Sequence, residues 1–125
     1  MPGYITIRPT DEAFPRITFN TIPAVEPPKI EVLQGVVGGL IAPLFTVDSP
    51  LTDNEITGYV NDEGICLNLP VMANVKMSGQ TYPFCGNMVI TGLTRDGRTC
   101  LLSDAELDLL NRQWRTIYAT LNLDF

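Results

Sequence analysis

The stretch Met88–Glu106, MVITGLTRDGRTCLLSDAE, carries two clear structural signals. Two apolar, strand-like runs flank Asp96-Gly97, a dipeptide that suits the positive φ angles of a tight two-residue turn. This pattern predicts a β-hairpin formed by residues 88–94 and 98–102. The stretch then ends in a capping box, in which Ser103 and Glu106 each bind the other's backbone amide. A helix is therefore expected to begin directly after the hairpin.

The residues after this capping box predict an amphipathic C-terminal helix over residues 103–121. Apolar side chains recur there at intervals of three and four residues, which places them in one stripe along a helix. Asp108 and Arg112 lie one turn apart, where opposite charges can pair. The stripe consists of Leu107, Leu110, Trp114, Ile117 and Leu121.

The N-terminal part of the chain predicts two strands and a short helix. Tyr4–Arg8 and Arg16–Asn20 alternate apolar and polar side chains, as half-buried strands do, and they can pair as a hairpin. A proline-rich connector then extends to Pro28. The next segment, Lys29–Val37, has apolar residues at helical spacing, and Gly38-Gly39 is expected to end this helix in a left-handed conformation.

The middle of the chain predicts further strands. Leu40–Val47 is a nearly continuous apolar run in which Pro43 indicates a bulge or an edge position. Residues 56–60 and 65–69 flank the turn-forming Asn61–Gly64, so we expect a second hairpin there. For residues 71–77 a helical turn and irregular structure both remain open. The expected fold class is α+β: a small mixed sheet of about five to six strands built from hairpins, with a short central helix and the C-terminal helix.

Composition narrows the range of functions. The chain has 125 residues, a formal net charge of −6 and no histidine. This length suits a single domain over residues 1–125. Without histidine there is no imidazole base and no His-containing catalytic triad, and no activated nucleophile or opposed carboxylate pair is evident, so we expect neither an enzyme nor a cofactor. The acidic balance argues against binding to nucleic acid or to anionic membranes, which requires clustered lysine and arginine.

The N-terminus and the cysteines bear on the compartment. No signal peptide and no run long enough to span a membrane is evident, so we expect a cytoplasmic protein, in the host cell's cytoplasm if a phage encodes it. Cys66, Cys85 and Cys100 are widely spaced and have apolar neighbours. Because no C-x-x-C spacing occurs, we interpret them as small reduced core residues rather than metal ligands or a redox pair.

Five residues are candidate ligand-binding residues. Arg95 and Arg98 bracket the Asp96-Gly97 turn and can clamp a phosphate or carboxylate if a second subunit adds donors; solvated turn residues are the alternative. Asn61 and Glu63 place side-chain oxygens in a tight turn, but the ligand spacing of a calcium loop is missing, so a plain hairpin tip is favoured and no metal site is expected. Tyr59 can stack on a base, with core packing as the commoner alternative.

Four stretches, in their order and spacing, carry a family resemblance. They are Ile30–Gly39, Tyr59–Gly64, Leu69-Pro70 and Cys85–Gly92. Together they resemble DUF3846, a family of uncharacterised domains found in bacteriophages and actinobacteria. The resemblance covers a core of residues 29–110, and residues 1–28 add N-terminal strands and the connector. It implies a phage or mobile-element accessory protein with a small α+β fold, no established activity and a role of the counter-defence type.

The chain also departs from the family pattern. Leu40 and Ala42 stand where an aromatic and an acidic residue are expected, and Met72 stands where an asparagine is expected. These departures affect polar positions. No polar site is therefore transferred to this chain from the family.

Three functions remain open after these exclusions. The first is non-catalytic sequestration of a small anionic, nucleotide-derived ligand by an oligomer. The second is a protein-interaction factor that inhibits or redirects a host protein through an acidic face or an exposed part of Leu40–Val47. The third and least favoured is a DNA mimic, because the 14 acidic residues are scattered rather than set in a dense row. Exposed strand edges lead us to expect a homo-oligomer in any of these cases.

Overall fold

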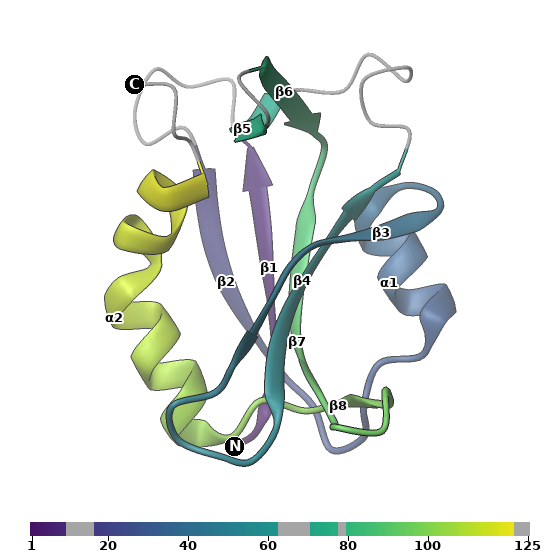
Figure 1. The fold of residues 1–125 in the computed structure, drawn as a ribbon. Helices are drawn as coiled ribbons and strands as arrows, with labels where there is room; N and C mark the ends of the chain where they lie inside the picture. The colour runs from purple at the N-terminus through teal and green to yellow at the C-terminus, as the bar shows by residue number, and fades with distance from the viewer. Residues whose placement is uncertain (10–16, 63–70, 78–79, 122–125) are drawn as a thin grey trace.

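The computed structural model describes residues 1–9, 17–62, 71–77 and 80–121. In this part of the chain two helices lie on opposite sides of one antiparallel β-sheet (Figure 1). A separate two-stranded sheet lies at one end of the main sheet in the same view. This arrangement confirms the predicted α+β fold class.

The main sheet has the strand order β2-β1-β7-β4-β3, and β8 pairs with part of β7. The small sheet consists of β5 and β6. All of these strand pairs are antiparallel. The elements are β1 (Gly3–Pro9), β2 (Ile17–Pro23), α1 (Ile30–Val37), β3 (Ile41–Asp48), β4 (Glu55–Asn61), β5 (Val71–Met77), β6 (Gln80–Cys85), β7 (Met88–Leu93), β8 (Thr99–Cys100) and α2 (Asp104–Leu121).

Two predicted hairpins are confirmed. Strands β1 and β2 pair along their whole length, with Ile5 opposite Thr21. Strands β7 and β8 pair around the Asp96-Gly97 turn, where Gly97 has φ of +89°. Only glycine adopts this left-handed conformation without steric cost, which explains the strength of the sequence signal.

The middle of the chain differs in part from the predictions. Of the predicted hairpin, the turn residues 63–64 and the second strand, residues 65–69, lie outside the described part. Among the described residues, β3 occupies one edge of β4, and β7 occupies the other as far as Tyr59, through residues at least 30 positions further along the chain. Residues 71–77 form strand β5 rather than a helical turn, and the sequence analysis did not anticipate β6.

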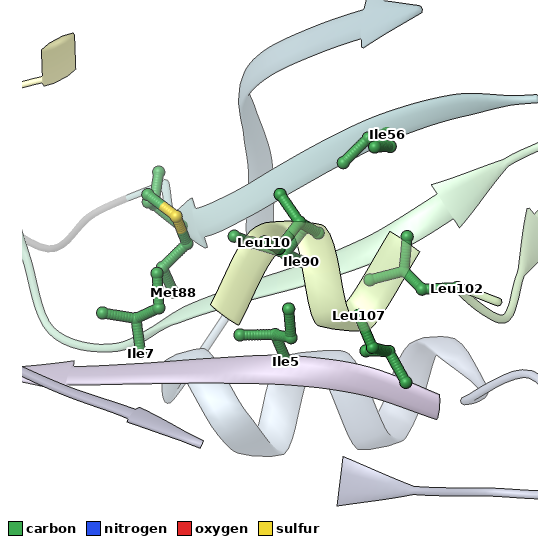
Figure 2. Close-up of a cluster of buried hydrophobic side chains, with 9 residues drawn as sticks. Ile5, Ile7, Ile56, Met88, Ile90, Leu102, Leu107 and Leu110 are labelled. Atoms are coloured by element: carbon green, nitrogen blue, oxygen red, sulfur yellow. The ribbon is translucent and has the colours of Figure 1, made fainter. Parts of the chain in front are cut away.

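The larger hydrophobic core lies between the sheet and α2. Alternate residues of β1, β4 and β7 point to this face, and Figure 2 shows Leu107 and Leu110 of α2 close to Ile5 and Ile90. Both leucines are buried, as the predicted stripe requires. The side chains of Trp114, Ile117 and Leu121 lie outside the described part. The buried members are Ile5, Ile7, Ile56, Val60, Met88, Ile90, Leu102, Leu107 and Leu110.

The opposite face of the sheet carries a smaller core beneath α1. Leu33 and Val37 of the helix are buried against Val89 of β7. Tyr4, Val36, Ile41 and Tyr59 are only partly buried around them. The same face also buries the threonines of neighbouring strands: Thr6, Thr57 and Thr91. This face therefore contains more polar atoms and fewer aliphatic ones than the α2 face.

Strand β3 forms one edge of the main sheet, and its register with β4 shifts between Pro43 and Phe45. The predicted bulge and edge position of Pro43 are both confirmed. The Phe45 ring lies over Gly58 of β4: a Cβ atom built on Gly58 would stand 2.3 Å from Cε1 of that ring. Glycine at position 58 is thus required by close approach, and the ring fills the space that a side chain would take.

The N-terminus of α2 has the predicted capping box. The Ser103 amide donates to Glu106 Oε1 over 2.9 Å, and the Glu106 amide donates to Ser103 Oγ over 3.2 Å. The other carboxylate oxygen of Glu106 accepts from the Thr52 hydroxyl over 3.3 Å, which ties the β3–β4 loop to the helix. One turn along α2, the predicted pair of Arg112 and Asp108 forms over 3.1 Å.

Candidate functional site

Arg95 lies in the β7–β8 turn and binds the neighbouring β3–β4 loop. Its Nη1 pairs with Asp48 Oδ1 at 2.9 Å, and its Nε donates to the backbone carbonyl of Asp53 over 2.9 Å. One guanidinium thus connects the end of β3, the following loop and the turn. The arginine predicted as a ligand-binding residue is used inside the chain, and a ligand anion would compete with Asp48 for it.

Arg98 lies on the other side of the same turn and pairs with Asp96, with Nε 3.1 Å from Oδ2. The second carboxylate oxygen of Asp96 accepts a hydrogen bond from the Thr94 hydroxyl. This hydrogen bond, followed by the Arg98 guanidinium, holds the pKa of Asp96 below its ordinary value. The carboxylate is therefore ionised at neutral pH, and the local charge of Arg98 is largely balanced.

Tyr59 and Asn61 lie near the C-terminal end of β4, beneath α1. Tyr59 is partly buried against the cluster of Leu33, Val37 and Val89, as the core-packing interpretation requires. Asn61 is only 4% exposed, and its Nδ2 donates to the backbone carbonyl of Val37 over 3.1 Å. Its amide nitrogen thus serves the last turn of α1, where carbonyl groups have no partner within the helix.

Asn87 makes the matching contact from the start of β7. Its Nδ2 donates to the backbone carbonyl of Val36 over 2.9 Å. We call Asn61 and Asn87 the amide clamp, because together they hold two successive carbonyls at the C-terminus of α1. The sequence analysis did not single out Asn87. An asparagine beside a turn glycine is a common loop signal, and nothing in it indicates a partner 51 residues earlier.

The end of α1 has the geometry that the amide clamp needs. Gly38 adopts φ of +84° and donates its amide to the Gln34 carbonyl over 2.8 Å, so the predicted helix stop is confirmed. A Cβ atom on Gly39 would stand 2.9 Å from Nδ2 of Asn61. The two glycines therefore have different roles: one turns the chain, and the other leaves room for the clamp.

The five predicted site residues do not form one cluster among the described residues. Strand β4 pairs antiparallel with β7, so Asn61 stands at one end of this pair and the Arg95–Arg98 turn stands at the other. Glu63 lies outside the described part of the chain. The arginines and the Tyr59–Asn61 pair therefore belong to different ends of the sheet.

The solvent side of α1 carries an exposed valine and an exposed glycine. Val32 is 43% exposed, and Glu31 and Gly35 beside it on the helix surface are exposed too. A Cβ atom built on Gly35 would meet nothing within 4 Å. The chain's own packing thus gives no reason for a glycine there, although glycine in a helix interior is destabilising by roughly 0.5–1 kcal/mol relative to alanine.

Exposed apolar side chains gather in the same part of the sequence. Of the large hydrophobic residues exposed in the described structure, all except Met1 fall between residues 25 and 51. They are Val25, Ile30, Val32, Leu40, Val47 and Leu51. The segment thus joins the proline-rich connector, α1, β3 and the loop after it. Leu40 and Val47, the two ends of the predicted apolar run, are 61% and 51% exposed.

Acidic and cysteine side chains are the remaining groups among the described residues that could form a metal or thiol site. No group of three or more acidic or cysteine side chains in this part of the chain is placed to hold a metal ion. Cys100 is a half-buried thiol, and burial, followed by the nearby Glu106 carboxylate, raises its pKa. It is therefore protonated at neutral pH. Cys66 and the side chain of Cys85 lie outside the described residues.

Among the described helices, none is both long enough and apolar enough to cross a membrane.

The family model described as "Domain of unknown function (DUF3846)" matches residues 5–115. The chain belongs to the DUF3846 family. The DUF3846 match begins in β1 and reaches α2, so it extends beyond the core of residues 29–110 expected from the motifs. Neither the curated proteins nor the solved structures gave a match. In this DUF3846 member, Gly38, Gly39, Asn61 and Asn87 come from three of the stretches that carry the family resemblance, and they meet at the end of α1.

Proposed function

We propose that this protein is a non-catalytic interaction factor that binds a partner protein through the solvent side of α1. The observation that carries the proposal is Gly35. It occupies the middle of a surface helix and weakens that helix, and no described group stands within 4 Å of the place that a Cβ atom would take there. A glycine in such a position suits close approach of another backbone, since a partner can lie directly on the helix at that point.

The surroundings of Gly35 support the same function. Val32 and Ile30 are exposed on the two flanks of the helix, at 43% and 54%. Glu31 lies in the first turn and is exposed as well. We expect a partner with an apolar surface that touches Val32 and a basic group that faces Glu31. In a phage setting this partner is a host protein that the factor inhibits or redirects.

The amide clamp gives the surface its rigidity. Two side-chain hydrogen bonds and a left-handed glycine fix the C-terminal turn of a helix of only eight residues. Isolated helices of this length are unstable in water. Holding α1 in advance lowers the entropy that binding would otherwise cost.

The test uses two substitutions of Gly35 that separate the stability of the chain from its binding to the partner. Gly35→Ala should raise the free energy of unfolding by about 0.5–1 kcal/mol and weaken partner binding, and Gly35→Leu should abolish binding while leaving the chain folded. A photo-crosslinking residue at position 32 should capture one defined protein in cells that express the chain. The matched control is the same crosslinker at position 51, an exposed aliphatic site outside α1.

The outcomes separate this function from its competitors. A crosslinked protein at position 32 that Gly35→Leu removes supports the proposal. Equal capture at positions 32 and 51, or binding unaffected by Gly35→Leu, contradicts it. Retention of a compound of low molecular mass, lost on Arg95→Ala or Arg98→Ala, would instead support sequestration of an anionic nucleotide-derived ligand. That ligand would have to displace Asp48 or Asp96 from its arginine.

A further inference from the structure

Strand β3 has one edge that no other described strand covers, because it is the last strand in the order β2-β1-β7-β4-β3. Unpaired edges of this kind expose backbone N–H and C=O groups to pairing with another chain. Which partner can pair with this edge depends on which of its backbone groups point away from β4.

Two backbone hydrogen bonds at the ends of the β3–β4 pair fix the direction of the backbone groups along β3. The Asp62 amide donates to the Leu40 carbonyl over 2.8 Å, and the Ser49 amide donates to the Asn54 carbonyl over 3.0 Å. These pairs mark hydrogen-bonded positions at the two ends of the β3–β4 ladder. In an antiparallel ladder such positions alternate with positions whose backbone groups point away from the partner strand. Counting back from Ser49, the backbone groups of Asp48 and Thr46 therefore face outward.

The first half of the edge is unsuited to pairing. Pro43 has no amide hydrogen to donate, and the register shift between Pro43 and Phe45 interrupts the regular backbone. Natural edge strands use both devices to prevent association. The second half, Thr46–Asp48, carries neither device, and all three of its residues are exposed.

We propose that two copies of this chain pair through Thr46–Asp48 of β3, antiparallel and related by a two-fold axis at Val47. Thr46 then exchanges backbone hydrogen bonds with the partner's Asp48, and the symmetric pair does the same, which gives four bonds. The two Val47 side chains lie directly opposite each other, at the position where antiparallel strands bring Cβ atoms within about 4.5–5.5 Å.

Three features favour a second copy over another kind of strand. Val47 is 51% exposed in one copy and would be covered by its own equivalent in the pair. The two-fold places each Asp48 opposite a threonine rather than opposite the other Asp48. Arg95 already balances the Asp48 charge, at 2.9 Å, which reduces repulsion at this edge between two chains of net charge −6. The inference does not depend on the function proposed for α1.

The first experiment compares association of the intact wild-type chain with that of two lysine variants by sedimentation and native mass spectrometry. Wild type should form a dimer with a Kd no weaker than about 1 mM. Val47→Lys places two like charges opposite each other and should weaken the dimer at least about tenfold. Leu51→Lys is the matched control: it is equally exposed, lies outside the ladder and should leave the dimer intact.

The second experiment tests the position of the two-fold axis. Val47→Cys should give a disulfide-linked dimer under mild oxidation, since paired positions of this type have the Cα separation that a disulfide needs. Two controls are oxidised in parallel. Leu51→Cys shows how much linkage an added cysteine gives at another exposed site, and wild type shows how much the native cysteines give. A wild-type chain that stays monomeric, or a dimer that survives Val47→Lys, overturns the proposal. So does linkage no stronger in Val47→Cys than in the two controls.

Discussion

The two faces of the main sheet are built from different kinds of contact. On the α2 face, nine buried aliphatic and methionine side chains from four elements and the segment before α2 form one continuous core. On the α1 face, the buried core of the described residues consists of Leu33, Val37 and Val89, and two asparagine amides bind the end of the helix. Apolar burial is strong but non-directional, whereas amide hydrogen bonds are weaker and fix position. The α2 face thus stabilises the fold, and the α1 face sets the position of a helix whose outer side is open.

The largest expected difference between the faces comes from truncating one core residue on each. Ile90→Ala, at a fully buried position facing α2, should lower the free energy of unfolding by about 4 kcal/mol. Leu33→Ala on the α1 face should cost about 2–3 kcal/mol, because the side chains that surround its small cluster are only partly buried and water can fill part of the space. Urea unfolding measures both. Equal losses would mean that the two faces contribute equally.

The amide clamp provides the next comparison. Asn61→Ala should lower the free energy of unfolding by about 2 kcal/mol, because it leaves a buried helix carbonyl without its donor. Asn87→Ala should cost about 1 kcal/mol, since Asn87 is more exposed. Hydrogen exchange should accelerate in α1 in both variants and stay unchanged in α2. Faster exchange in α2 would show that the clamp supports the whole fold rather than one helix.

Glu106 tests whether a buried polar group matters as much on the α2 side. Glu106→Ala removes the acceptor for the Ser103 amide and for the Thr52 hydroxyl, and it should cost about 1–2 kcal/mol. Asp108→Ala, an exposed ion-pair residue on the same helix, is the control and should cost less than about 0.5 kcal/mol. If Glu106→Ala lowers the free energy of unfolding by less than Asn87→Ala does, hydrogen bonds of buried side chains contribute more to stability on the α1 side than on the α2 side.

The smallest effect is expected at the β7–β8 turn, which neither helix covers. Thr94→Val and Arg98→Ala should each raise the pKa of Asp96 toward its ordinary value, because the Thr94 hydroxyl and then the Arg98 guanidinium lower it. Since the pKa of Asp96 is lowered by folding, its contribution to stability is present above the pKa of an unfolded aspartate and is lost as the pH falls through the lowered value. NMR titration of the Asp96 carboxyl in wild type and the two variants measures both changes. A variant in which the pKa of Asp96 stays at the wild-type value would exclude the substituted residue as a cause.

Local sequence signals predicted much of the fold because they act over a few residues. The turn at Asp96-Gly97, the capping box of Ser103 and Glu106, and the stop at Gly38 all depend on neighbours in the chain, and all three are present. The pairing of β4 with β7 joins residues far apart in the chain, and no local signal indicates it. Ten consecutive residues of sequence do not show whether a strand continues into a hairpin or pairs with a neighbouring strand on each side.

The candidate site was harder to predict for the same reason. Arg95 and Asn61 were selected for chemistry that suits a ligand, and the structure places each against a group of its own chain, Asp48 and the Val37 carbonyl. In the sequence, Gly35 belongs to the glycine-containing stretch Gly35–Gly39, whose order of elements favours a helix stop over a phosphate-binding loop, so its place on the helix surface is not evident. Its significance rests on exposure and empty space around it, which only coordinates provide.

The contact between Phe45 and Gly58 has a consequence for how this family can vary. Since the Phe45 ring occupies the place of a side chain at position 58, the two positions are epistatic: a larger residue at 58 is tolerated only if the residue at 45 becomes smaller. Family members that carry alanine or valine at the equivalent of 58 are therefore expected to have exchanged the aromatic ring at 45 for a small side chain. Coevolution of this pair across an alignment would record the closeness of the two strands without any structure.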